Sequence, residues 1–141
     1  MGNYPENMVA PMREELVQAG FTQLFTPADV DAALARPGST LLVLNSVCGC
    51  AAGNLRPGVI EAVKGRGLVF DHLVTVFAGM ETEAVSQART HFGGAAPSSP
   101  NVAIFLDGKL LSHMPRTAIQ DLGPGQIADQ LEQVARDVKK G

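Results

Sequence analysis

Hydrophobic residues gather in short runs along this chain, and the spacing within each run predicts its secondary structure. The run Thr40–Ser46 is continuous, as is typical of a strand covered on both faces of a sheet, and Leu68–Phe77 predicts a second strand. A third run, Val102–Leu106, also predicts a strand. The Asp-Gly pair that follows it favours a tight turn and an antiparallel return over Lys109–Met114. The pattern therefore predicts four strands.

Helical patterns separate the first three strands and follow the fourth. After the first strand, apolar residues recur at helical spacing up to about Lys64, although Pro57-Gly58 should kink this helix or divide it in two. Further helices are predicted at Glu81–His91 and Pro124–Lys139. The order after residue 38 is therefore β-α-β-α-β-β-α. This is the order of a thioredoxin-like α/β fold, with a central four-stranded mixed sheet flanked by helices.

The residues before this core predict helices only. One helix is expected at roughly Pro11–Ala19, and a second begins after Thr26, a good N-cap residue, and ends near Ala35. We therefore predict a single domain in which residues 1–38 form an N-terminal helical extension and residues 39–141 form the core.

Composition and charge narrow the classes of partner. The chain has 141 residues, 45% of them hydrophobic and 18% charged, which fits one globular domain. A net charge of -3, without a run of basic residues, argues against nucleic acid or an anionic membrane as partner. The first twenty residues lack the basic and apolar regions of a secretory signal. We expect a cytoplasmic protein.

The candidate chemistry lies where the first strand meets the following helix, at Cys48-Gly49-Cys50. In the first turn of a helix, the Cα atoms of two such cysteines lie roughly 5.5 to 6.5 Å apart, within the range of a disulfide. Gly49 would relieve crowding in so small a loop. Free backbone N–H groups at a helix start stabilise a thiolate, so Cys48 is predicted to be the nucleophile and Cys50 the resolving thiol. This account needs no basic side chain, and the nearest in sequence is Arg56.

Other interpretations of the cysteine pair stay open. Both residues fit an ordinary apolar environment, and a close pair in a reducing cytosol is either catalytic or metal-binding more often than structural. A zinc site would need ligands from His72, His91, His113 or carboxylates, and no two of these histidines have ligand spacing. We therefore expect no resident cofactor, while a transient metal adduct on the reduced thiols stays open.

A second candidate feature is the Ser99-Pro100 pair just before the third strand. Proline cannot donate to a strand ladder, which makes its position at the start of a core strand unusual. In a thioredoxin-like fold such a proline is cis, faces the cysteines and exposes a backbone edge where a substrate strand can pair. A plain loop proline is the alternative.

Several polar residues have two interpretations each. Asn45 and Ser46 either hydrogen-bond near the sulfurs or cap the helix. Arg116 either binds a carboxylate of a low-molecular-weight thiol or is solvated, and we favour the solvated state. His113, on the fourth predicted strand, is expected to be an ordinary surface or core histidine.

Five stretches of the chain together resemble the bacilliredoxin family: Tyr4-Pro5, Met8–Arg13, Asn45–Gly53, Val76–Gly79 and Pro97–Pro100. The resemblance implies a thioredoxin-like fold in a bacterial cytosol and an activity that removes bacillithiol from mixed disulfides on other proteins. Cys48 would take the bacillithiol onto itself, and Cys50 or a second bacillithiol would release it.

The implied partners are bacillithiolated proteins, bacillithiol and a recycling reductase, with no nucleic acid and no membrane. We expect substrate contacts at Ser46, Gly49, Ser99 and Pro100. General disulfide isomerase or reductase activity, and a non-enzymatic module that carries metal on its thiols, are the alternatives. The segment Met114–Thr117 departs from the family, whose members usually have a longer connection with another histidine there.

Overall fold

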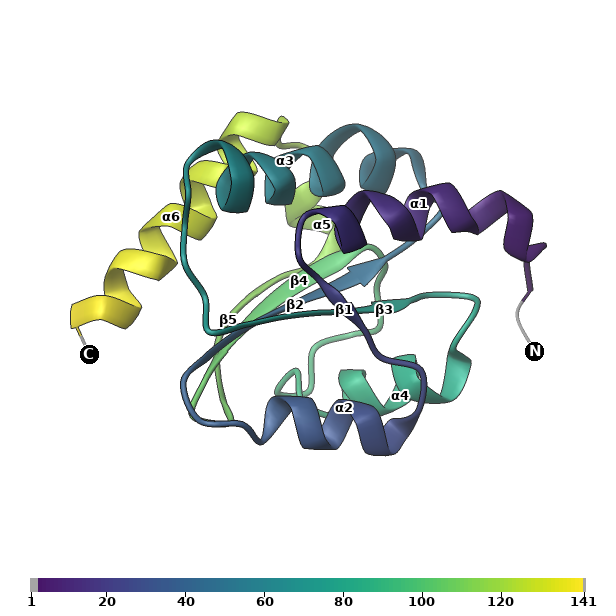
Figure 1. The fold of residues 1–141 in the computed structure, drawn as a ribbon, viewed down its shortest axis with the longest axis horizontal. Helices are drawn as coiled ribbons and strands as arrows, with labels where there is room; N and C mark the ends of the chain where they lie inside the picture. Colours follow the sequence, from purple (N-terminus) through teal and green to yellow (C-terminus); the bar gives the residue numbers. More distant parts are fainter. Residues whose placement is uncertain (1–2, 141) are drawn as a thin grey trace.

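The computed structural model describes residues 3–140, which form a five-stranded sheet in the order β1-β3-β2-β4-β5 (Figure 1). β3 runs parallel to β1 and β2, β4 is antiparallel to β2, and β5 is antiparallel to β4. The sheet is therefore mixed, as predicted. The strands are β1 (Thr22–Gln23), β2 (Ser39–Asn45), β3 (His72–Phe77), β4 (Asn101–Leu106) and β5 (Lys109–Met114).

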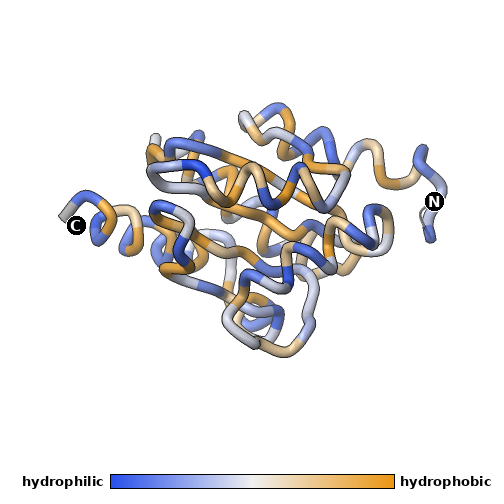
Figure 2. Tube along the Cα trace, turned by 90° about the horizontal axis from the view of Figure 1, so that it is seen from below, coloured by the Kyte–Doolittle hydropathy of each residue, from blue (hydrophilic) through white to orange (hydrophobic). Residues whose placement is uncertain are grey.

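Helices cover both faces of the sheet (Figure 1). One face carries α1 (Glu6–Gln18), α3 (Arg56–Ile60), α5 (Arg116–Ile119) and α6 (Pro124–Lys140), and the other carries α2 (Pro27–Leu34) and α4 (Thr82–Arg89). Side chains of a strand alternate between the faces, so β2 buries Leu41 and Val43 under the first group and Leu42 and Leu44 under the second. Figure 2 shows polar and apolar stretches alternating within single helices, which gives each helix a buried and a solvent side.

The N-terminal segment differs from its prediction in two ways. α1 begins at Glu6, and Pro11 lies inside it rather than at its start. The only bond that Pro11 removes is the one to the Asn7 carbonyl in the first turns of the helix, while buried Val9 anchors this end. β1 was not predicted, because a strand of two residues is too short to show an alternating pattern. Thr26 caps α2 as predicted, in a capping box with Asp29.

The helix after the cysteines is continuous, although its hydrogen-bond pattern changes twice. Two π-helical stretches, η1 (Ala51–Leu55) and η2 (Glu61–Gly65), flank α3. Pro57 is the second residue of α3, and the preceding π turn joins the Arg56 N–H to the Ala51 carbonyl. The expected break at Pro57-Gly58 is thus a change of helix type.

One further boundary and one further helix differ from the sequence prediction. β3 begins at His72 rather than Leu68, because the N–H of Leu68 closes the preceding helix on the Ala62 carbonyl and Val69 is exposed to solvent. The short helix α5 after β5 was not predicted. Within residues 3–140, no helix is both long and apolar enough to cross a membrane.

Candidate active site

Cys48 and Cys50 lie at the junction of β2 and the helical segment that leads to α3. The carbonyl of Cys48 accepts hydrogen bonds from the N–H groups of Ala51 at 3.0 Å and Ala52 at 3.2 Å, so the helix begins directly after Cys48. Both cysteines are free thiols, and their sulfurs lie 2.9 Å apart in a hydrogen bond. The structure therefore places the pair at a helix start, as the sequence predicts.

The surroundings act on the two thiols in opposite directions. The pKa of Cys48 is lowered, first by the hydrogen bond from Cys50 and further by the backbone N–H groups of Cys50 and Ala51 and the positive charge of Arg116. The pKa of Cys50 is raised, first by burial and then by the hydrogen bond and negative charge of Cys48. Cys48 is thus the thiol that becomes a thiolate first.

This asymmetry predicts the order of alkylation. At a pH between the two thiol pKa values, iodoacetamide should modify Cys48 well before Cys50, because the thiolate is the reacting form. Below the pKa of Cys48 both rates fall, and above the raised pKa of Cys50 the difference closes. Tandem mass spectrometry can locate the label within the peptide that carries both cysteines. In urea the preference should disappear, and earlier labelling of Cys50 in the native protein would contradict the assignment.

Below the cysteine loop lies a network of buried polar groups. The Ser46 hydroxyl accepts the Cys48 N–H at 3.1 Å, which is the capping contact that was one of its two predicted interpretations. The Asn45 side-chain oxygen accepts the Ser46 N–H at 2.8 Å and an Nη1 hydrogen of Arg56 at 2.9 Å. Arg56 had no predicted role, because nothing in its spacing shows that it turns back toward the end of β2.

The predicted cis peptide bond between Ser99 and Pro100 is confirmed. β4 pairs with β2 up to Leu44 and Asn101, so one residue further along this register Pro100 lies opposite Asn45. Pro100 is buried and Ser99 is partly exposed. The Ser99-Pro100 pair therefore lies at the same end of the sheet as the cysteine loop, and pairing of a substrate strand with Ser99 stays a prediction.

Arg116 acts on the site although it lies far away in the sequence. Its side chain is exposed, as expected, and its backbone N–H donates to the Ser98 hydroxyl at 3.3 Å. Its positive charge, however, lowers the pKa of both cysteines, so the expectation that Arg116 is merely solvated is incomplete. No local motif could have shown this, because the β4–β5 hairpin and α5 together bring Arg116 to the site.

Gly49 leaves the cysteine loop open to solvent. It is exposed, and apart from its two neighbours no atom lies within 4 Å of a Cβ built at this position. Crowding beyond the two cysteines is therefore not what requires glycine here. The surface at Gly49 is therefore open to solvent, while both cysteines are partly exposed.

The three histidines have different partners. His113 stacks on Phe92 with ring centroids 4.6 Å apart, and burial lowers its pKa. His72 bonds to the Pro37 carbonyl and His91 to Asp31. Across residues 3–140, no group of three or more His, Cys, Asp or Glu side chains is placed to hold a metal ion.

Known proteins with similar sequences belong to one family of redox proteins by name. The sequence model of the Disulphide isomerase family matches residues 4–138. A protein of Cytophaga hutchinsonii named bacilliredoxin is 47% identical over 131 residues, covering 93% of this chain and 96% of the relative. A bacilliredoxin of Geobacillus kaustophilus is 48% identical over 126 residues, covering 89% of this chain and 86% of the relative.

Solved structures share the fold at low sequence identity. A putative oxidoreductase with a thioredoxin fold superposes with a TM-score of 0.64 at 13% identity, over 84% of this chain and 96% of the other. Thioredoxin from Trypanosoma brucei brucei superposes with a TM-score of 0.60 at 17% identity, over 84% of this chain and 93% of the other. The predicted thioredoxin-like fold is confirmed.

Proposed function

The chain belongs to the bacilliredoxin family, and from this premise we propose that it removes bacillithiol from mixed disulfides on other proteins. In general terms it is a thiol–disulfide oxidoreductase of thioredoxin-like fold. The observation that carries the proposal is the reduced Cys48–Cys50 pair at a helix start, with the more acidic thiol at Cys48.

In the first step the Cys48 thiolate attacks the bacillithiol sulfur of the mixed disulfide. The bond between that sulfur and the target protein breaks, a Cys48–bacillithiol disulfide forms, and the target thiolate leaves and takes up a proton. Cys50 then loses its proton and attacks the Cys48 sulfur, which releases bacillithiol as a thiolate. The Cys48–Cys50 disulfide holds the two oxidising equivalents until a recycling thiol reductase removes them.

A second bacillithiol offers another way to complete the cycle. Its thiolate would attack the bacillithiol sulfur of the adduct, which releases bacillithiol disulfide and restores Cys48 as a thiolate. In this branch Cys50 is not oxidised. Both branches regenerate the reduced Cys48–Cys50 pair. We propose that the reaction takes place in the bacterial cytosol.

Two features of the site support a small anionic adduct. The open space around Gly49 gives a small thiol access to the sulfurs. Arg116 is exposed beside them, and its guanidinium takes no part in the ion pairs found among residues 3–140. Bacillithiol carries carboxylate groups, and a guanidinium pairs well with a carboxylate.

The description of the matched family favours a second candidate, isomerisation of protein disulfides. The same target protein should be offered in two forms, one bacillithiolated and one with scrambled disulfides. We expect faster release of bacillithiol, measured as the loss of its mass from the target, than recovery of native disulfides. A double variant, Cys48→Ala with Cys50→Ala, provides the blank for both reactions.

The opposite order of rates would favour the isomerase. One equivalent of tightly held zinc or iron in the reduced protein, together with unreactive thiols, would instead favour a metal-carrying module.

A further inference from the structure

Arg56 is buried beneath the cysteine loop, although it carries a positive charge. It is the largest of the fully buried side chains, with 2% of its surface exposed. Burial of a charge is costly unless hydrogen bonds and a counter-charge compensate it. The partners of Arg56 therefore indicate what its burial stabilises.

Both hydrogen bonds of the Arg56 guanidinium go to the segment that leads to Cys48. Nη1 donates to the Asn45 side-chain oxygen and to the Ser46 carbonyl, each at 2.9 Å. Ser46 in turn accepts the Cys48 N–H with its hydroxyl, and Asn45 accepts the Ser46 N–H. Arg56 and the Cys48 backbone are thus joined through Ser46, while no hydrogen bond from Arg56 reaches a thiol.

The counter-charge comes from α1. Glu15 Oε1 lies 3.3 Å from Arg56 Nε, and this contact is an ion pair rather than a hydrogen bond, because Nε has no aligned acceptor. The Asn45 side-chain amide donates to the Met12 carbonyl of the same helix at 3.2 Å. α1, which lies beside α3 (Figure 1), therefore contacts the network through Glu15 and Met12.

We propose that Arg56 is a positioning residue for Cys48, which fixes Ser46 and thereby holds the Cys48 sulfur against the N–H groups at the helix start. The inference rests on the proposed redox role of Cys48, but not on which thiol it handles. When Arg56 is removed, Asn45 and the Ser46 carbonyl lose their donor and the loop gains freedom. The backbone N–H groups of Cys50 and Ala51 then face the sulfur less well, and the thiolate is less stable.

The test measures Cys48 alone, in full-length protein with Cys50→Ala as the common background. Thiolate absorbance at 240 nm against pH gives the titration of Cys48, and iodoacetamide gives its rate of alkylation. Arg56→Met should slow alkylation at neutral pH on the order of 10-fold and move the titration to higher pH, since small displacements of a reacting group cost rate steeply. Arg56→Lys, which keeps the charge and can keep one donor contact, should restore part of the loss.

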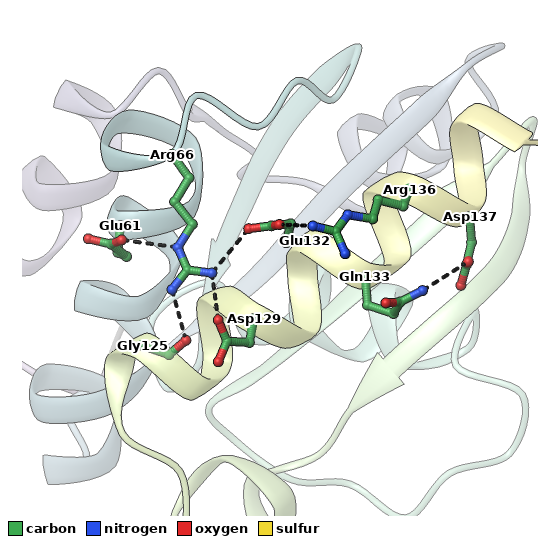
Figure 3. Close-up of polar contacts among 8 residues, drawn as sticks. All are labelled: Glu61, Arg66, Gly125, Asp129, Glu132, Gln133, Arg136 and Asp137. Atoms are coloured by element: carbon green, nitrogen blue, oxygen red, sulfur yellow. Dashed lines mark hydrogen bonds and ion pairs between the residues drawn. The ribbon is translucent and has the colours of Figure 1, made fainter.

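Arg66 provides a matched control for the removal of an arginine. Its guanidinium bonds to Glu61 at 3.1 Å, Asp129 at 2.6 Å, Glu132 at 3.2 Å and the Gly125 carbonyl at 3.3 Å (Figure 3). It directly follows the far end of the helical segment that starts at the cysteines. Arg66→Met should cost some stability and leave the Cys48 titration unchanged.

The outcomes separate the role of Arg56 from general destabilisation. Folded Arg56→Met with an unchanged Cys48 titration would overturn the inference, as would an equal shift in Arg66→Met. If Arg56→Met does not fold, the Arg56→Lys titration decides. If wild-type protein with normal Cys48 reactivity fails to release bacillithiol, that result counts against the proposed function and leaves this inference intact.

Discussion

Replacement of Cys48 with alanine should reduce release of a disulfide-bound thiol to the rate of the uncatalysed exchange. Cys48 is the thiol whose pKa is lowered, and without it no thiolate lies at the helix start to attack the mixed disulfide. Cys50 cannot take its place, because burial is the largest cause that raises its pKa and does not depend on Cys48. The rate of adduct release from a modified target protein measures the loss directly.

Replacement of Cys50 should have a different result. Cys50→Ala keeps the attacking thiol, so the first step still releases the target protein, but the resolving thiol is absent and the adduct stays on Cys48. Mass spectrometry of the intact variant should show a stoichiometric adduct that dithiothreitol removes. Addition of free bacillithiol should also clear it if the second branch operates. The assigned roles would be refuted if Cys48→Ala kept full activity, or if the Cys48→Ala variant formed an adduct on Cys50.

The position of the cysteine pair at a helix start and the lowered pKa of Cys48 could be predicted from the sequence because they depend on local structure. A buried strand followed by a helix start is visible in the hydrophobic pattern, and the position of Cys48 between them fixes which sulfur meets the free N–H groups. The cis peptide before β4 was likewise predicted from the position of Pro100 at the start of an apolar strand. In each case the determining residues lie within a few positions of one another.

The residues that tune and support the site were not predictable in this way. Arg56 lies eight residues after Cys48 and turns back toward the sheet only because the helix does, while Arg116 reaches the thiols through the β4–β5 hairpin and α5. Glu15 belongs to a segment that the pattern shows as a separate extension. Such contacts depend on how elements pack, and hydrophobic periodicity does not encode the partner of a polar side chain. The short edge strand β1 and the π-helical stretches were missed for a related reason, because neither has a distinctive pattern at its length.

The second large prediction concerns Gly58, which lies in the helix that follows the cysteines. In α3 this residue faces α6, and a Cβ added there would lie 2.8 Å from Ile127 Cβ and 3.0 Å from the Pro124 carbonyl oxygen. Neither atom is the flexible end of a side chain, so the two helices would have to move apart. Extra carbons in a packed interior cost about 1–3 kcal/mol, whereas replacement of a helical glycine by alanine gains about 1 kcal/mol in helix propensity.

Gly58→Ala should therefore lower the free energy of unfolding modestly, and Gly58→Val should lower it by about 3 kcal/mol, since valine adds two more carbons without the same helix propensity. Urea unfolding followed by circular dichroism measures both. Gly53→Ala is the matched control, because Gly53 lies in the same helical segment and a Cβ added there would meet no atom within 4 Å, so this change should leave stability unchanged or raise it. If Gly58→Val had the same free energy of unfolding as the wild type, α3 and α6 would be able to move apart at no cost, which would contradict the prediction.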